Sequence, residues 1–396
     1  MRLNRVLFYA GVTVLTLMMI FSVSMLRAGA EGTGGGIFDE LEEPEISAKA
    51  AIVYNGATGE VLYSKDSTQK LPMASTTKIM SALIVLEQED RGVDLNEKFT
   101  VDSDAVMTEG SSMGLKAGDK VSLYDLCCGM LLPSGNDAAN AAAVRVAGSV
   151  EGFVEMMNRR ARELGLYSTN FVTPSGLDDY TDQHYSTAAD MAVLTAEAMK
   201  DRRFRDICSQ QDIKLCFGDP PFDRWLKNTN RLLRYDDITG VKTGFTDKAR
   251  RCLVSACMRE GCELICVTLN DPDDWQDHRA LFDYCFAKVS AQSVSGARVS
   301  LNAVGADKDR VSCRAEGIRL TMKNGAAERV KTEIRAEPFV YGPIKTGRKV
   351  GEVIYTLDGF EIGRTALRTD EELKAQKARL SLWDRLRVLA GEILTG

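Results

Sequence analysis

The order of strand-like and helix-like segments constrains the fold of this chain most strongly. Residues 51–54 and 61–63 flank the turn-forming run Asn55-Gly56-Ala57-Thr58-Gly59 and predict an opening β-hairpin. Apolar residues recur with helical spacing over 79–86, 123–130, 153–164 and 191–199, and strand-like runs return over 253–269. This order predicts an α+β domain over residues 46–290, in which strands from both ends form one antiparallel sheet that carries a helical lobe.

Two further segments follow this domain. Residues 291–368 alternate in short runs, broken by Asn324-Gly325 and Asp358-Gly359, and predict a small all-β domain. Residues 369–396 predict an amphipathic helix from Glu371 onward, with Trp383 beside an apolar face and several basic residues: Leu382, Leu386, Leu389, Ile393; Lys374, Lys377, Arg379, Arg385 and Arg387. Such a helix either lies on a membrane surface or packs on the β domain.

The first thirty residues predict a secretory signal. Arg2 and Arg5 precede an apolar run from Val6 to Leu26, and Ala28-Gly29-Ala30 offers a cleavage site. The run is also nearly long enough to span a bilayer, so an uncleaved anchor is the alternative. Both interpretations place the rest of the chain outside the cytoplasm, in the cell wall or at the outer face of the membrane. Residues 31–45 are Gly- and acid-rich and predict a flexible spacer.

Charge and cysteine content narrow the function classes. The 396-residue chain has a net charge of −6, and residues 1–30 contain three Arg and no acid, so their removal leaves −9 and argues against a nucleic-acid partner. Its ten cysteines are too sparse for a disulfide-stapled scaffold. Cys127 and Cys128 are expected to be buried apolar residues. Four others lie on the predicted hairpin over 252–269, which leaves a cross-strand disulfide open: Cys252, Cys257, Cys262 and Cys266. A zinc site is disfavoured there, because no His is close.

A serine and a lysine near the start of the first predicted helix suggest nucleophilic catalysis. Ser75 and Lys78 are three residues apart, and a helix that begins after Pro72 places them on one face. A serine hydroxyl needs a neighbouring base, and a lysine can be that base if burial or a nearby cation lowers its pKa. The helix N-terminus adds a backbone N–H beside a developing oxyanion.

The same Ser-x-x-Lys spacing occurs at Ser67 and Lys70, in a polar connection that runs into a proline, so no helix holds that pair in register. Two later motifs support Ser75 instead. Ser134-Gly135-Asn136 begins 59 residues after Ser75 and follows an apolar helix. Lys242-Thr243-Gly244 begins 108 residues after Ser134 and opens a strand. Copies of these motifs at Ser168-Thr169-Asn170 and Lys345-Thr346-Gly347 lack that context.

A Ser-His-Asp triad is the competing serine arrangement. Only His184 and His278 are available, and no Gly-x-Ser-x-Gly elbow accompanies them. We expect His184 to order the loop over residues 182–190 near the site, and His278 to be a surface or packing residue.

The three motifs, in this order, resemble the signature of penicillin-binding proteins and serine β-lactamases. The chain closely resembles the serine-type D-alanyl-D-alanine carboxypeptidases, which are low-molecular-mass penicillin-binding proteins. The segments that carry this resemblance are residues 71–80, 132–138, Ser175-Gly176-Leu177, 184–188 and 242–246. The resemblance covers essentially the whole chain. It implies a penicillin-binding/β-lactamase-like catalytic fold, the D-Ala-D-Ala end of the peptidoglycan stem peptide as substrate, β-lactam antibiotics as inhibitors, and no metal or cofactor.

The resemblance also implies roles for individual residues. Ser75 would attack the carbonyl of the penultimate D-Ala with Lys78 as base, and Ser134 would relay the proton to the leaving D-Ala. Asn136 would hold the peptide. The substrate-binding strand would comprise Lys242, Thr243, Gly244 and Phe245: Lys242 and Thr243 would bind the terminal carboxylate, and the N–H groups of Ser75 and Phe245 would form the oxyanion hole.

One departure and two alternatives remain. The family usually has Gly where this chain has Arg250, which bears on substrate preference. A serine β-lactamase would need a deacylating Glu four residues before an Asn, but Leu166 stands four before Asn170. A non-catalytic wall-binding protein of the same fold is the other alternative, although every expected polar group is present.

Overall fold

One antiparallel sheet organises the first domain. The structure, a computed structural model, describes residues 42–376. The sheet has the strand order β2-β1-β9-β8-β7, and all its neighbours run antiparallel: β1 (Ala50–Asn55), β2 (Glu60–Lys65), β7 (Ile238–Thr246), β8 (Arg250–Arg259) and β9 (Cys262–Leu269). Strand β1 from the start of the domain pairs with β9 from its end. The predicted assembly of the sheet from both ends is therefore confirmed.

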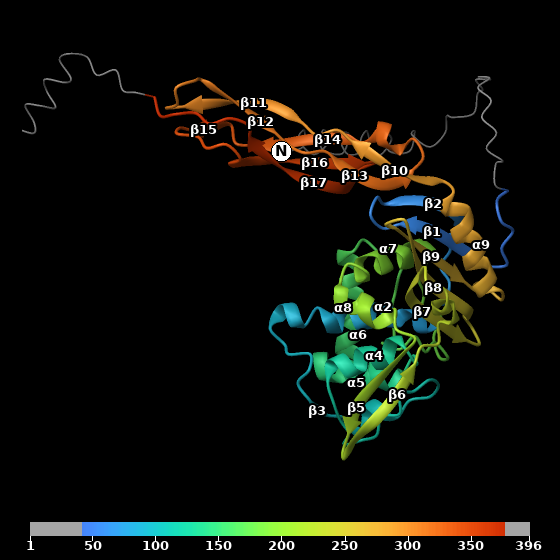
Figure 1. Cartoon of the computed structure of the whole chain (residues 1–396). Helices are drawn as coiled ribbons and strands as arrows, with labels where there is room; N and C mark the ends of the chain where they lie inside the picture. The colour runs from blue at the N-terminus through green and yellow to red at the C-terminus, as the bar shows by residue number, and fades with distance from the viewer. Residues whose placement is uncertain (1–41, 377–396) are drawn as a thin grey trace, which may run out of the picture. The chain divides into compact units, whose positions relative to one another are not determined.

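Helices cover both faces of this sheet (Figure 1). Alternate residues of β1 face opposite sides, so Ala50, Ile52 and Tyr54 belong to the core shared with the helical lobe, whereas Ala51 and Val53 face the core shared with α9. The helices are α2 (Lys78–Leu86), α3 (Ser103–Val106), α4 (Leu123–Leu131), α5 (Asn136–Ala147), α6 (Val150–Glu163), α7 (Ala188–Ala198), α8 (Arg202–Cys208) and α9 (Asp274–Phe286).

Short elements complete the domain, and some of them have no clear signal in the sequence. Two small two-stranded sheets and three 3-10 turns connect the larger elements: β3 (Phe99–Thr100) with β4 (Lys120–Val121), β5 (Asp212–Gly218) with β6 (Pro221–Lys227), η1 (Ala74–Thr77), η2 (Glu89–Arg91) and η3 (Arg231–Arg234). Helix α5 was not predicted from the sequence. Its residues, NDAANAAAVRVA, are rich in alanine, and the helix is buried around most of its circumference, so it has no apolar stripe opposite a polar face.

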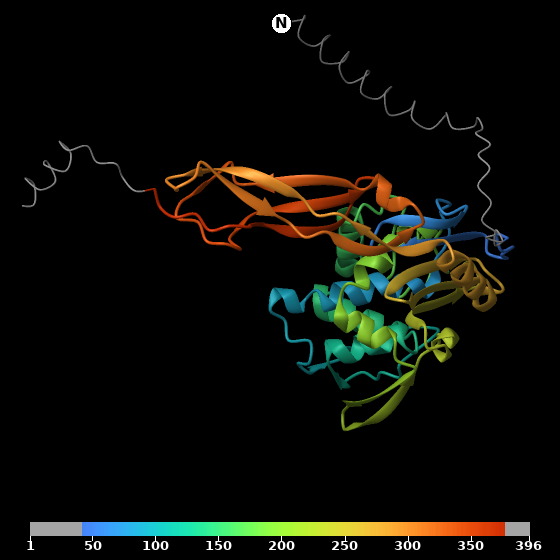
Figure 2. The same cartoon turned by 45° about the horizontal axis from the view of Figure 1, so that its top comes forward.

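The second domain is all β, as predicted (Figure 2). It has a two-stranded sheet, β10-β13, and a six-stranded sheet, β14-β16-β17-β12-β11-β15, in which β11 and β15 are parallel. Its elements are β10 (Val289–Val294), β11 (Arg298–Val304), β12 (Arg310–Arg314), β13 (Ile318–Lys323), η4 (Ala326–Arg329), β14 (Lys331–Ala336), β15 (Phe339–Tyr341), β16 (Lys349–Leu357) and β17 (Phe360–Thr369). Its core is separate from the two cores of the first domain.

The predicted C-terminal helix does not begin at Glu371. Strand β17 continues to Thr369, and beyond it Leu373 and Ala375 form isolated β-bridges with Ile344 and Ala306. These backbone pairs extend the sheet edge, which explains the difference for residues 371–376. The remainder of the predicted helix, the predicted signal over 1–30 and the spacer up to residue 41 lie outside the described residues.

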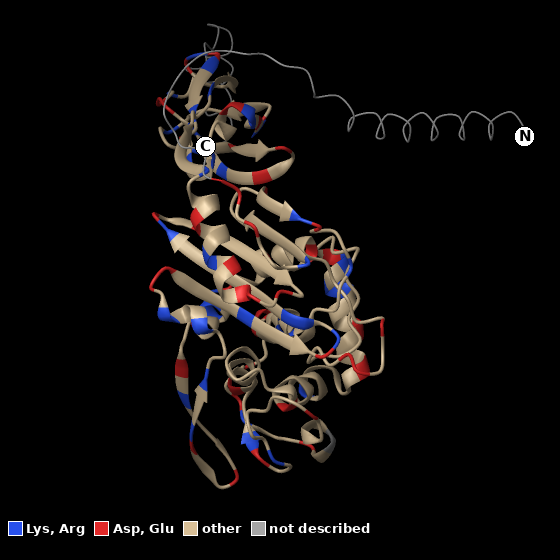
Figure 3. Cartoon of the chain, turned by 90° about the vertical axis from the view of Figure 1, so that its right-hand side faces the viewer, with Lys and Arg blue, Asp and Glu red and all other residues tan. Residues whose placement is uncertain are grey.

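Basic and acidic residues are intermixed along the described part of the chain. Figure 3 shows basic and acidic positions interspersed over this side of the molecule. Among residues 42–376, no helix is both long and apolar enough to cross a membrane.

All ten cysteines lie within the described residues, and all ten are free thiols. A cross-strand disulfide in the β8–β9 hairpin, which the sequence left open, is ruled out by the register. Cys252 lies opposite Leu269, and Cys257 lies opposite Leu264, so neither faces a second cysteine across the ladder. Cys127 and Cys128 are fully buried, as expected.

Candidate active site

Ser75 and Lys78 lie together where the helical lobe meets the sheet. Ser75 is in the 3-10 turn η1, and Lys78 is the first residue of α2, so the serine precedes the α-helix proper by one turn. Lys78 Nζ lies 2.9 Å from Ser75 Oγ. The predicted pairing is present, and this distance is within reach for direct proton transfer.

Lys78 is completely buried, and three oxygen atoms surround its amino group. Besides Ser75 Oγ, Nζ donates to Asn136 Oδ1 at 2.7 Å and to the Ser175 carbonyl at 2.6 Å. Burial lowers the pKa of Lys78 well below its ordinary value, and the charge of Lys242 lowers it further, while Asp137 opposes the shift. A neutral lysine amine next to a serine hydroxyl is a competent general base.

The second motif joins two helices beside this pair. Ser134 lies between the end of α4 and the start of α5, in a left-handed conformation with φ of 67°, and it lines the cavity next to Ser75. Asn136 is the first residue of α5, and its amide bridges Lys78 Nζ and the Glu109 carbonyl. The motif therefore supplies one hydroxyl and one amide to the site, as the sequence predicted.

Asp137, which the sequence analysis did not single out, holds the loop over residues 111–115 in place. Its buried carboxylate accepts backbone N–H groups from residues 113–115, and Ser112 Oγ donates to it at 2.6 Å. The same loop contributes the Ser111 carbonyl, which accepts the Asn136 N–H at 2.7 Å. These bonds hold the loop containing Ser111 against the start of α5, where Ser111 lines the cavity.

The third motif lies inside β7 rather than at its start, and its strand passes directly along η1. A Cβ added to Gly244 would lie 3.2 Å from the Ser75 backbone nitrogen, so only a glycine allows this close approach without displacement. Lys242 is buried, and burial lowers its pKa to about 7. Thr243 Oγ1 lies 2.6 Å from Thr229 Oγ1, a partner that sequence reasoning missed.

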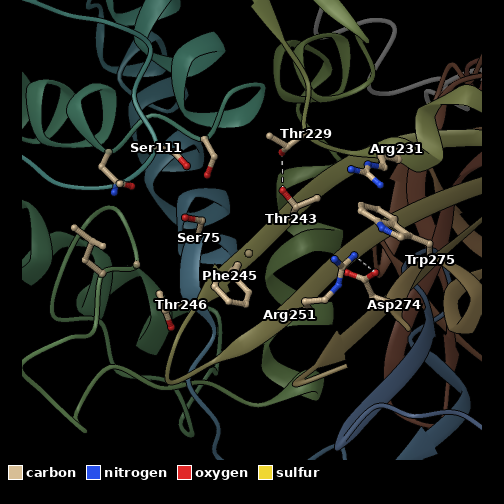
Figure 4. Close-up of a pocket in the computed structure, with 16 residues that line it drawn as sticks. Ser75, Ser111, Thr229, Arg231, Thr243, Phe245, Thr246, Arg251, Asp274 and Trp275 are labelled. Atoms are coloured by element: carbon tan, nitrogen blue, oxygen red, sulfur yellow. Dashed lines mark hydrogen bonds and ion pairs between the residues drawn. The ribbon is translucent and has the colours of Figure 1, made fainter. Parts of the chain in front are cut away.

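These groups open into one cavity of about 470 Å³ (Figure 4). It is lined by Ser75, Ser134, Asn136, Thr243, Gly244 and Phe245 together with Gly110, Ser111, Gly176, Leu177, Thr229, Arg231, Thr246, Arg251, Asp274 and Trp275. Lys78 and Lys242 lie behind this wall, because both side chains are buried. The structure thus brings together all eight residues predicted for the site.

Neither histidine acts as a catalytic base in a triad. His184 is buried; its Nδ1 accepts the Val172 N–H, so Nε2 carries the proton and donates to Thr77 Oγ1 at 2.8 Å. Burial lowers the pKa of His184 to about 4, which keeps the ring neutral. His184 therefore ties its loop to η1, as expected. His278 is buried between Ser255 and Thr268, so of its two expected roles it has the packing one.

Arg250, where the resemblance led us to expect glycine, occupies a left-handed position. It ends the β7–β8 turn opposite Thr246, with φ of 59°, and its guanidinium lies 6.0 Å from the Phe245 ring centroid. Left-handed backbone costs a residue with a Cβ about 1–2 kcal/mol, which explains why glycine suits this position.

We expect Arg250→Gly to raise the free energy of unfolding by about 1 kcal/mol, because glycine removes that backbone penalty. Denaturant unfolding of the purified protein measures the change. Arg250→Ala is the matched control, since alanine loses the guanidinium but keeps the Cβ. If Arg250→Gly is no more stable than Arg250→Ala, the backbone explanation is wrong.

A serine with a buried lysine base, set between a helical lobe and the edge strand of an antiparallel sheet, defines a class of serine acyl-transfer enzymes. Comparison with known families gives the same class. The profile of the D-alanyl-D-alanine carboxypeptidase family matches residues 39–273, and that of the penicillin-binding protein 5 C-terminal domain matches residues 296–375. The chain belongs to the D-alanyl-D-alanine carboxypeptidase family.

Individual relatives match this chain over most of their own length. The chain is 30% identical over 338 residues to D-alanyl-D-alanine carboxypeptidase DacF of Bacillus subtilis, covering 83% of this chain and 86% of that protein. It is 32% identical over 362 residues to DacC of Escherichia coli, covering 87% and 88%. Penicillin-binding protein 5 of Haemophilus influenzae has a similar structure, with a TM-score of 0.64, 27% identity, and coverage of 84% of this chain and 99% of that one.

Proposed function

We propose that this protein is a serine D-alanyl-D-alanine carboxypeptidase that removes the terminal D-Ala from peptidoglycan stem peptides. The observation that carries the proposal is the buried Lys78 amine 2.9 Å from Ser75 Oγ at the wall of the cavity. Family membership and the relatives named above support the same activity. Penicillins, as mimics of the D-Ala-D-Ala end, would acylate Ser75 and remain attached.

The reaction begins with proton transfer from Ser75 to neutral Lys78. Ser75 Oγ attacks the carbonyl carbon of the penultimate D-Ala, and the oxyanion is placed at the N–H groups of Ser75 and Phe245. The close approach of Gly244 to the Ser75 nitrogen supports this pairing of β7 with η1. The C–N bond then breaks, Ser134 passes the proton to the leaving amine, and water hydrolyses the ester and frees Ser75.

The cations and amides of the site would hold the peptide during these steps. Asn136 orients the peptide backbone beside Lys78. The positive charge of Lys242 attracts the terminal carboxylate, and Thr243 donates a hydrogen bond to it, with Thr229 fixing the threonine hydroxyl. None of these steps calls for a metal ion, because Lys78 takes the proton and the N–H groups of Ser75 and Phe245 receive the oxyanion.

The direct test is D-Ala release from diacetyl-Lys-D-Ala-D-Ala, together with labelling by fluorescent penicillin. We expect the wild-type protein to release D-Ala and to keep the label, and we expect Ser75→Ala to do neither. Ser67→Ala, in the other Ser-x-x-Lys pair, is the control and should behave as wild type. Rapid loss of the label would identify a β-lactamase instead, and labelling without D-Ala release would identify a binding protein.

The two buried lysines predict a bell-shaped dependence of kcat/KM on pH. Activity needs Lys78 neutral, so it rises with pH as Lys78 loses its proton; it also needs Lys242 charged, so it falls as pH passes the Lys242 pKa of about 7. Lys242→Arg keeps a cation at high pH, and we expect it to move the alkaline limb upward. An alkaline limb that stays in place in this variant would contradict the assignment.

The location of the enzyme is part of the proposal. An exported, extracytoplasmic protein at the cell wall fits its substrate and the signal predicted over residues 1–30. Contact of residues 377–396 with the membrane surface is proposed from their basic and apolar pattern alone. Sedimentation of the full chain with anionic lipid vesicles, compared with a chain ending at residue 376, tests that contact.

A further inference from the structure

The cavity continues past the groups assigned to catalysis. Beyond Thr243, as seen from Ser75, it is lined by Arg231 of η3, Arg251 of β8, and Asp274 and Trp275 of α9 (Figure 4). If Thr243 binds the carboxylate of the departing D-Ala, these four residues lie on the leaving-group side. D-Ala has only a methyl side chain, so it does not account for this part of the cavity.

The charge of this extension is not balanced. Arg251 forms an ion pair with Asp274, and its guanidinium stacks on Trp275 at 5.4 Å from the ring centroid. Arg231 is exposed at the wall, and within residues 42–376 its guanidinium has no ion-pair or hydrogen-bond partner. One positive charge therefore faces the cavity uncompensated, next to the half-buried indole of Trp275. This end suits a ligand with an anionic group and an aliphatic stem.

We propose that Arg231 and Trp275 form a leaving-group subsite for amines that carry a second carboxylate beyond the one held by Lys242 and Thr243. This proposal rests on the proposed function and extends its substrate class. The reaction is the same: the Ser75 Oγ–carbon bond forms, the carbon–nitrogen bond breaks, and the leaving amine takes the proton. Such an amine is either an acidic D-amino acid at the peptide end or the amine of a neighbouring, cross-linked peptide.

Matched peptides separate this charge effect from size. Diacetyl-Lys-D-Ala-D-Glu and diacetyl-Lys-D-Ala-D-Gln differ in one carboxylate and are nearly equal in volume. We expect kcat/KM of the wild-type enzyme to favour D-Glu over D-Gln about fivefold, the effect of one partly exposed charge pair. In Arg231→Gln the ratio should fall to about one, and Arg231→Glu should favour the corresponding D-Lys peptide.

Arg234→Gln is the control, because Arg234 is on the same 3-10 turn, is exposed and does not line the cavity. It should keep the wild-type ratio. A wild-type ratio of one, or a ratio that does not change in Arg231→Gln, overturns the subsite. Failure to release any of the leaving groups would instead overturn the proposed function, so the two failures are distinguishable.

A cross-linked muropeptide dimer distinguishes the two sources of the anionic amine. Cleavage of the dimer by wild type, reduced several-fold in Arg231→Gln and unchanged in Arg234→Gln, assigns the subsite to cross-linked peptides. Preference for the D-Glu peptide without cleavage of the dimer assigns it to acidic terminal residues. If the dimer is cleaved equally by all three proteins and the D-Glu preference is also absent, the proposal is wrong.

Discussion

Lys78→Met is expected to slow both D-Ala release and penicillin acylation about 10²- to 10⁴-fold, the usual contribution of a general base. Methionine has a similar length and fills the same buried space, but it cannot accept the Ser75 proton. Without Lys78 the hydroxyl must lose its proton to water, and the acceptors Asn136 Oδ1 and Ser175 O lose their shared donor. Single-turnover labelling with fluorescent penicillin measures the acylation step directly.

The other Ser-x-x-Lys pair provides the control. Lys70 lies over the Tyr185 ring, 4.8 Å from its centroid, and does not line the cavity. We expect Lys70→Met to acylate at the wild-type rate. A thermal unfolding scan of both variants separates loss of chemistry from loss of fold. Wild-type acylation in a folded Lys78→Met protein would show that another group removes the proton.

Gly176→Ala is expected to lower the free energy of unfolding by about 2–4 kcal/mol and to reduce activity sharply. Gly176 has φ of 92°, and a Cβ there would lie 2.0 Å from the Ala74 carbonyl oxygen and 2.9 Å from the Ser75 nitrogen. Alanine must push the turn that carries Ser75 away from residues 175–176. Because Ser175 O also holds Lys78, the displacement would disturb nucleophile and base together.

Gly148→Ala is the matched control for the backbone conformation. Gly148 has φ of 79° at the end of α5, and an added Cβ meets nothing within 4 Å. We expect it to cost about 1 kcal/mol, the left-handed penalty without a clash. Denaturant unfolding and D-Ala release are measured for both variants. Equal losses in the two variants would mean that the contact with η1 is not what makes Gly176 necessary.

The local pairing of Ser75 and Lys78 was predictable because helical spacing determines it. The approach of the second and third motifs was predictable only through the family resemblance, since residues 134 and 242 are far from residue 75 in the chain. The roles of Asp137 and Thr229 were not predictable. Asp137 binds backbone groups of a loop more than twenty residues earlier, and backbone donors leave no pattern in a sequence.

The elements of the fold also divide into those that the sequence predicts and those that it does not. The buried strands β1, β8 and β9 were found as short apolar runs, and helix α6 was found by the apolar stripe of Phe153, Met157 and Ala161 on an otherwise polar helix. The polar hairpin β5–β6 and the alanine-rich α5 lack such a contrast and were missed. The helix predicted from residue 371 is absent over residues 371–376. Backbone pairing of this segment with Ile344 and Ala306 outweighs its local helical preference.

The free thiols bear on how the protein matures after export. Nine of the ten cysteines are buried, and burial raises the pKa of Cys208 and Cys252, for example, to about 12, so these thiols stay protonated and unreactive. Only Cys216 is exposed. The described domains thus reach their native state without any oxidation step, and their folding is independent of whether the surroundings hold oxygen or a disulfide-forming catalyst.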